Sequence, residues 1–175
     1  VKDDMKIIEK ASAGLEALIT APELKPDLIL MDVQMPGMDG LEATRKIKQV
    51  LPETIIVVLT IRDDDEKLFE ALKSGAQGYI LKDIRSKEML EMLRGAIHGE
   101  AALSPTLAGR ILKEFRRLGR GETGDDPGNS ITDREQGVLL LVAQGASDKE
   151  IAATLNLSIN TIKSHVRNIL SKLQV

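Results

Sequence analysis

The sequence lacks the residues on which several kinds of site depend. It has no cysteine among its 175 residues, which excludes a disulfide framework and a thiolate metal site. Its two histidines, His98 and His165, lie far apart in the chain and form no histidine-rich metal motif. The aromatic residues are Phe69, Tyr79 and Phe115, which are too few for a platform that stacks the bases of single-stranded nucleic acid.

Long apolar runs and a strong charge of one sign are also missing. The longest apolar run, "VLLLVA" at 138–143, is far shorter than the roughly 18 residues that a membrane-spanning helix needs. No charged-then-apolar signal segment opens the chain, so we expect a cytoplasmic protein with no membrane partner. The net charge of −3 excludes a uniformly basic nucleic-acid coat but leaves room for a local basic patch. With 42% apolar residues, the chain can build the cores of one or two ordinary domains.

The first part of the chain alternates short β-rich runs with helical patterns. These segments are "KIIEKA", "GLEALI", "DLILM", "GLEATRKIKQ", "TIIVVLT", "EKLFEALKSG", "GYILK" and "KEMLEMLRGAI". Such alternation predicts a parallel sheet with helices on its faces. The strands expected at 28–31 and 55–59 are continuously apolar, which is typical of strands covered on both faces.

After about residue 100 the pattern indicates helices only. A basic helix is expected over 104–118, where Ser and Pro form its first turn, and the Gly- and Asp-rich segment 119–130 is a flexible linker. Capping boxes "TDRE" and "SDKE" start helices at about 133–144 and 148–155, and a third helix follows at 160–173. We therefore divide the chain into an α/β domain (1–100), a linker with one helix (101–130) and a small all-α domain (131–175).

Polar residues end three of the predicted strands. Asp32 ends "DLILM", Thr60 ends "IIVVL" and Lys82 ends "GYIL". Ligands and reactive groups gather at the carboxyl ends of strands in open parallel sheets. Each residue alone has an ordinary structural explanation, but together a carboxylate, a hydroxyl and an ammonium can accept and stabilise a phosphoryl group. Asp39, in "DGLE", is better explained as a helix cap.

The last predicted helix has two distinct faces. An apolar stripe is formed by Ile162, Val166, Ile169 and Leu173. The opposite face is polar and basic, with Asn160, Lys163, Ser164, Arg167 and Ser171. The helix contains no acid and follows a short helix across the tight "NLS" turn, which is helix-turn-helix geometry. The pattern predicts that this helix enters the major groove of double-stranded DNA.

The motifs "PDLILMDVQMPGMDGLEA", "VVLT" and "GAQGYILKD" resemble the receiver domain of two-component response regulators, in this order and spacing. The resemblance implies a flavodoxin-like, doubly wound parallel sheet in which Asp32 accepts phosphate from a sensor histidine kinase. It also implies that Thr60 and Tyr79 form a switch pair and that Lys82 contacts the phosphoryl group. Mg²⁺ in this family is held by the acceptor, here Asp32, by the backbone carbonyl of Gln34, and by an acidic pair after the first strand.

The acidic pair has no good match in the sequence. Asp3 and Asp4 precede Asp32 too closely, since Asp4 lies only 28 residues before it, and we interpret both as loop residues. The segment "MKIIEKASAGLEAL" resembles the second strand and helix of a receiver, so the first strand and helix are absent from this sequence. We expect them to precede Val1 in the natural protein; completion by another chain or a degenerate domain are the alternatives.

Residues 131–175 resemble the LuxR-type DNA-binding domain, and beside a receiver they indicate the NarL/FixJ-type architecture. The resemblance implies that Lys163, Ser164 and Arg167 enter the major groove. Lys149, Thr161, His165 and Lys172 are expected near phosphates, and Asn160 joins the same DNA-binding surface. The last helix of this domain, which mediates dimer contacts, is expected beyond Val175.

The sequence therefore predicts a DNA-binding transcriptional regulator that is controlled by phosphorylation of Asp32 and is a homodimer when active. It is not expected to be an enzyme, apart from slow self-dephosphorylation. One alternative is a regulator of the same architecture that works without phosphorylation. A remote alternative is an Asp-nucleophile phosphatase of the haloacid-dehalogenase type, but Gln34 stands where those enzymes carry their general acid.

Overall fold

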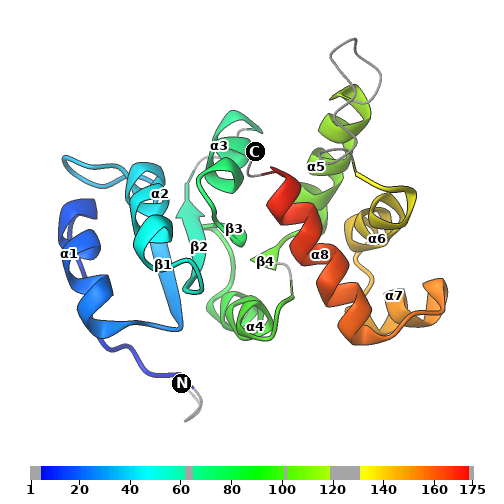
Figure 1. The fold of residues 1–175 in the computed structure, drawn as a ribbon, viewed down its shortest axis with the longest axis horizontal. Helices are drawn as coiled ribbons and strands as arrows, with labels where there is room; N and C mark the ends of the chain where they lie inside the picture. The colour runs from blue at the N-terminus through cyan, green and yellow to red at the C-terminus, as the bar shows by residue number, and fades with distance from the viewer. Residues whose placement is uncertain (1–4, 62–64, 101, 119–130, 174–175) are drawn as a thin grey trace.

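The first part of the computed structural model is an α/β domain built on one parallel sheet (Figure 1). The structure describes residues 5–61, 65–100, 102–118 and 131–173. The elements of this domain are α1 (Gly14–Leu24), β1 (Leu28–Asp32), α2 (Gly40–Val50), β2 (Ile55–Thr60), α3 (Asp65–Lys73), β3 (Gly78–Leu81), α4 (Ser86–Ile97) and β4 (Ala102–Leu103). The strands follow the order β1-β2-β3-β4, and every neighbouring pair is parallel. The predicted α/β fold is confirmed.

The two faces of the sheet are covered unequally. Ile56 of β2 faces a cluster with Ala43 and Ile47 of α2 and Ala21 of α1. On the other face, Val57 packs with residues of α4. Strand β2 is therefore covered on both sides, as its apolar sequence predicts.

Strand β1 is covered less completely than its sequence predicts. Leu30 is 38% exposed although it lies in the middle of the strand. β1 pairs only with β2, so its other edge has no strand partner among the residues described. The expectation of cover on both faces is correct for β2 and wrong for Leu30 of β1.

The segment "KIIEKA" does not form the strand that its composition favours. Residues 5–11 have no regular secondary structure, and Ile7 and Ile8 are 73% and 50% exposed. A strand is stabilised by pairing and by burial of one face rather than by backbone preference alone. Without a neighbouring strand here, β-branched residues are not sufficient.

The strand β4, which the sequence did not predict, forms the edge of the sheet opposite β1. Ala102 and Leu103 pair with β3 and are buried, in a region where we expected only helices. A strand of two residues is too short to produce an alternating pattern. Its position is decided by the sheet that it joins.

Helices make up the rest of the described chain, as predicted. They are α5 (Pro105–Leu118), α6 (Asp133–Ala143), α7 (Asp148–Leu155) and α8 (Ile159–Leu173). Both predicted capping boxes are present, Thr132 with Glu135 and Ser147 with Glu150. Gly145 ends the turn after α6 with φ +82°, a conformation that favours glycine. The predicted linker 119–130 lies outside the described residues.

One apolar core joins the two parts of the molecule. It runs from Leu72 of α3 and Tyr79 of β3, through Ile111 of α5, to Val138 of α6 and Ile169 of α8. Helix α8 lies beside β4 and α3 at the end of the sheet (Figure 1). The helical domain therefore packs directly on the α/β domain.

Among the described residues, no helix combines the length and apolarity that a membrane span requires.

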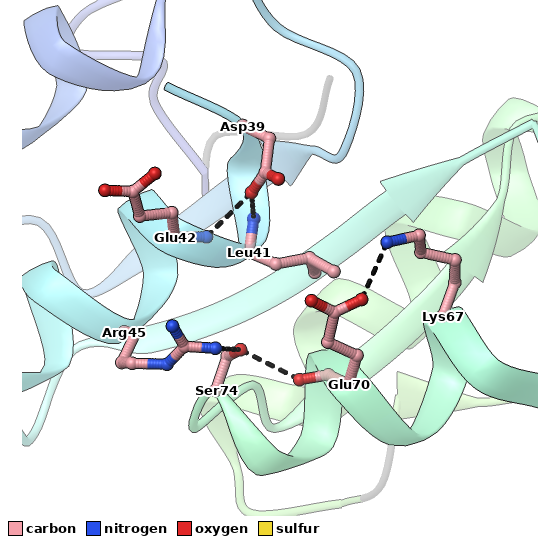
Figure 2. A network of polar contacts seen from close by, with 7 residues as sticks. All are labelled: Asp39, Leu41, Glu42, Arg45, Lys67, Glu70 and Ser74. Atoms are coloured by element: carbon pink, nitrogen blue, oxygen red, sulfur yellow. Dashed lines mark hydrogen bonds and ion pairs between the residues drawn. The ribbon is translucent and has the colours of Figure 1, made fainter. Parts of the chain in front are cut away.

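Polar contacts also join α2 to α3 at the surface (Figure 2). Arg45 Nη2 donates to Ser74 Oγ at 3.4 Å, and Ser74 Oγ donates to the carbonyl of Glu70 at 2.8 Å. Lys67 forms an ion pair with Glu70 at 2.7 Å. At the start of α2, Asp39 Oδ1 accepts hydrogen bonds from the backbone N–H groups of Leu41 and Glu42, which confirms the predicted cap.

Candidate functional site

The carboxyl edge of the sheet brings an acid and a base into contact. Lys82 Nζ donates to Asp32 Oδ2, and the two side chains are each 33% exposed. The backbone N–H of Gln34 donates to Asp32 Oδ1 at 3.0 Å. The carboxylate is thus held from two directions while part of it stays at the surface.

The sheet itself places these groups side by side. The N–H of Val33 donates to the carbonyl of Leu59 at 3.1 Å, and the N–H of Lys82 donates to the carbonyl of Thr60 at 2.7 Å. The ends of β1, β2 and β3 are therefore locked in register just where the polar residues begin. The edge brings together the backbones of Asp32, Thr60 and Lys82. The side chains of Asp32 and Lys82 also meet there.

A glycine that sequence reasoning missed fixes the backbone behind the acid. A Cβ at position 40 would overlap the carbonyl oxygen of Asp32. The N–H of Gly40 also donates to the carbonyl of Val33 at 3.0 Å, so the first turn of α2 lies directly against the end of β1. The dipeptide "DG" after Asp32 was a possible signal, but only the close approach of the two backbones reveals this role.

The other two residues of the predicted site are buried. Thr60 is 2% exposed and Tyr79 is fully buried. Tyr79 lies in the apolar core shared by α3, α5 and the helical domain. Any change in the position of its ring must displace neighbours that connect the two domains.

The described residues do not by themselves form a magnesium site. Among them, no group of three or more acidic or histidine side chains converges on one point. Asp32 supplies one carboxylate, and its Oδ2 is already in contact with Lys82. The candidate acids Asp3 and Asp4 lie outside the described residues. Mg²⁺ prefers several oxygen ligands, and Asp32 with the backbone carbonyl of Gln34 would supply too few of them.

The polar face of α8 differs in exposure along its length. Asn160, Ser164 and Arg167 are exposed, whereas Lys163 is only partly exposed. Lys163 Nζ lies 3.9 Å from a carboxylate oxygen of Glu100, which follows α4. Gly99 lies close to both Lys163 and Arg167. The turn after α4 thus lies against the face that was predicted to read DNA.

The other predicted phosphate contacts are in varied surroundings. Lys149 is exposed, His165 is partly buried, and the backbone N–H of Thr161 donates to Ser158 Oγ at 3.1 Å. Lys172 Nζ instead donates to Glu135 Oε2 at 2.7 Å. This lysine is engaged inside its own domain.

Glu135 is a buried acid that the sequence presents only as part of a capping box. Burial alone would raise the pKa of its carboxyl, but hydrogen bonds from Lys172 and Thr132 outweigh that effect and lower the pKa. Its Oε2 accepts from the N–H of Thr132 at 2.8 Å and from Lys172. The pair fixes the end of α8 to the start of α6.

An unpaired carboxylate oxygen lies where the two domains meet. Asp148 Oδ2 is buried and has no hydrogen-bond partner among the residues that the structure describes. Burial raises the pKa of Asp148, the negative charge of Glu100 raises it further, and Lys163 partly opposes both effects. Two acids from different domains thus share one lysine. No sequence signal predicted this electrostatic coupling, because Glu100 and Asp148 are far apart in the chain.

Comparisons with known proteins agree in both halves of the chain. Residues 1–94 match the response regulator receiver domain, and residues 129–175 match the luxR family of bacterial regulatory proteins. The chain is 42% identical over 172 residues to the transcriptional regulatory protein LiaR of Bacillus subtilis, covering 98% of this chain and 80% of LiaR. It is 38% identical over 174 residues to the response regulator protein VraR of Staphylococcus epidermidis, covering 99% of this chain and 80% of VraR.

A solved structure adds a likeness in three dimensions. It is RcsB from Salmonella enterica serovar Typhimurium, bound to the promoter rprA in the presence of the phosphomimetic BeF3−. The TM-score is 0.51 at 25% identity, and the match covers 97% of this chain and 80% of that one.

Proposed function

Because the chain belongs to the two-component response regulators that join a receiver domain to a LuxR-type DNA-binding domain, we propose that phosphorylation of Asp32 controls whether α8 binds DNA. Members of this family are transcriptional regulators, and receiver domains generally bind Mg²⁺. The contact between Lys82 and Asp32 at the carboxyl edge of the sheet is the observation that carries the proposal.

The proposed reaction is the transfer of a phosphoryl group from a histidine of a sensor kinase. A carboxylate oxygen of Asp32 attacks phosphorus, the P–N bond breaks, and the imidazole nitrogen keeps the electron pair and takes up a proton. The product is an acyl phosphate with a charge of about −1.5 to −2. Lys82, already beside Asp32, is placed to neutralise phosphoryl oxygens. Slow hydrolysis of this acyl phosphate would reset the protein.

The signal is proposed to reach the DNA-binding domain through the shared core. Thr60 ends β2 beside the acceptor, and Tyr79 lies on β3 within the cluster that holds α5 and α8. As the proposed switch pair, they would reorient and loosen the packing between the domains. Cores respond to such changes by discrete repacking, because they are close-packed.

DNA recognition is assigned to the exposed polar face of α8. We propose that Lys163, Ser164 and Arg167 enter the major groove, with Asn160 beside them, while Lys149, Thr161 and His165 lie near phosphates. The side chain of Lys172, also predicted near phosphates, is 20% exposed and is engaged with Glu135. The RcsB relative is described as bound to promoter DNA, which supports this assignment. The active form would be a homodimer in the cytoplasm that reads two half-sites.

Reading DNA requires α8 to separate from the receiver. The ion pair of Glu100 with Lys163 and the closeness of Gly99 to Arg167 support this step. Glu100→Gln is expected to raise the affinity of the unphosphorylated protein for DNA about two-fold, since partly exposed ion pairs contribute at most about 1 kcal/mol. A gel-shift assay on a duplex selected from a random-sequence pool would measure it, with Glu91→Gln on the outer face of α4 as control.

Phosphorylation is tested by intact-mass measurement. The wild-type chain is incubated with acetyl phosphate, with and without Mg²⁺, and Asp32→Asn is the control. We expect added phosphoryl mass on the wild type only. No added mass on a folded wild-type chain in either arm would favour the phosphorylation-independent regulator. Turnover of a small phosphate ester that Asp32→Asn abolishes would instead indicate a phosphatase.

A further inference from the structure

A pocket of about 290 Å³ lies between the receiver and α8. The receiver contributes Lys48 from the last turn of α2 and Gln77 from the segment before β3, and α8 contributes Arg167 and Ser171. The pocket lies apart from the carboxyl edge of the sheet that carries Asp32 and Lys82, since none of its lining residues belongs to that edge. The proposed function gives this pocket no role.

The polar groups that line this pocket are mainly donors. Gln77 Oε1 accepts from the N–H of Ile56 at 2.9 Å, which leaves the amide nitrogen of Gln77 for another partner. Ser171 adds a hydroxyl group, and none of the described residues that line the pocket is acidic. Within the described part of the chain, Arg167 has no carboxylate within ion-pair distance. A pocket of this composition is complementary to an anion.

Lys48 is a cation held without a carboxylate contact in the part of the chain that the structure describes. Its Nζ donates to the carbonyls of Pro52 at 2.7 Å and Thr54 at 2.8 Å, so one of its three N–H groups remains for another partner. Burial lowers the pKa of Lys48, while the negative charge of Glu53 partly opposes that effect. A bound anion would stabilise the charged ammonium.

We propose that this pocket binds a small phosphate-bearing anion and that the bound anion holds α8 against the receiver. Lys48 and Arg167 would contact it from opposite domains, with Gln77 and Ser171 donating further hydrogen bonds. A guanidinium is suited to bidentate contacts with phosphate. The volume has room for more than one phosphate group, so inorganic pyrophosphate is a suitable probe. The coupling rests on the proposed function, because Arg167 is also a proposed DNA contact.

Pyrophosphate binding is measured first by calorimetric titration of the whole chain, with sulfate at equal ionic strength as the reference anion. Lys48→Gln is expected to weaken binding about tenfold, because it removes one charge-assisted hydrogen bond. Lys46→Gln is the matched control: it removes the same charge from the same helix, but Lys46 pairs with Glu42 at the surface. Equal affinities in the two variants would overturn the proposal, since they would indicate only diffuse attraction.

Two further measurements keep the test decisive if Lys48→Gln does not fold. Ser171→Asp places a carboxylate at the pocket and should abolish pyrophosphate binding. In the wild type, the side-chain amide resonances of Gln77 should shift on titration with pyrophosphate but not with sulfate. Unshifted Gln77 resonances at saturation would overturn the assignment of the pocket.

The coupling to DNA is tested separately. Pyrophosphate at a concentration between the dissociation constants of the wild type and Lys48→Gln should weaken binding to the pool-selected duplex in the wild type and in Lys46→Gln, and much less in Lys48→Gln. Unchanged DNA affinity with pyrophosphate bound would overturn the coupling. Failure of the phosphorylated, anion-free wild type to bind any duplex would contradict the proposed function and leave the titration result standing.

Discussion

The receiver and the DNA-binding domain each hold a lysine against a carboxylate, but in different surroundings. Asp32 and Lys82 are both 33% exposed at the open edge of a sheet. Glu135 and Lys172 are 4% and 20% exposed, and Thr132 donates two further hydrogen bonds to the same acid. The first contact lies where a reagent can reach it, whereas the second is enclosed by its own domain.

The difference indicates that burial, not the pairing itself, separates the structural contact of Lys172 from the proposed reactive contact of Lys82. Breaking an enclosed pair leaves a charge in a poorly solvated site, which is costly. Breaking a partly exposed pair returns both groups to water at little cost. A lysine that must exchange its carboxylate for a phosphoryl group belongs in the second situation.

The largest effect is expected for Lys172→Met. It leaves the buried Glu135 without its cation and should lower the free energy of unfolding by about 3 kcal/mol. Chemical denaturation followed by circular dichroism measures this. Lys149→Met, an exposed lysine in the same domain, is the control and should change stability by no more than about 0.5 kcal/mol. Equal effects of the two variants would contradict a structural role for Lys172.

Gly40→Ala should show that backbone packing, rather than the lysine, fixes the acid in the receiver. The added Cβ overlaps the carbonyl of Asp32, so we expect a loss of about 2 kcal/mol and slower phosphorylation. Gly37→Ala is the matched control: its Cβ meets no atom within 4 Å, although its φ of +77° strains alanine. It should lower stability by about 1 kcal/mol and leave the phosphorylation rate unchanged. A phosphorylation rate that falls equally in both would contradict the role of Gly40.

Acid should weaken the enclosed pair. The pKa of Glu135 is lowered in the folded protein, so its ionised form contributes stability above the ordinary glutamate pKa of about 4.3. That stability is lost as the pH falls through the lowered value. The midpoint temperature of thermal unfolding, measured from neutral to acid pH, should therefore fall less steeply for Glu135→Gln than for the wild type. Parallel curves would show that the pair does not contribute in this way.

The smallest stability effect is expected for Lys82→Met. Because both partners are a third exposed, removal of the ammonium should change the free energy of unfolding by less than about 1 kcal/mol. Phosphorylation by acetyl phosphate should nevertheless become much slower, which intact-mass time courses would reveal. A loss of stability as large as that of Lys172→Met would erase the distinction between the two contacts.

Much of this arrangement was predictable because it depends on local patterns. The capping residues Asp39, Thr132 and Ser147 and the apolar stripe of α8 act within a few residues of chain. The meeting of Asp32 and Lys82 was also predictable, because parallel strands align their carboxyl ends. Strand formation at residues 5–11 was wrongly predicted, since a strand needs a neighbour that a local pattern cannot supply.

The sequence by itself determined the two architectures, the helix boundaries and the polar groups at the strand ends. Only the tertiary structure decided that Lys172 contacts Glu135, that Glu100 contacts Lys163, and that Lys48 and Arg167 line one pocket. The physical reason is distance along the chain. Local patterns are set by backbone geometry and capping, whereas contacts between distant residues depend on how the two domains pack through their shared apolar core.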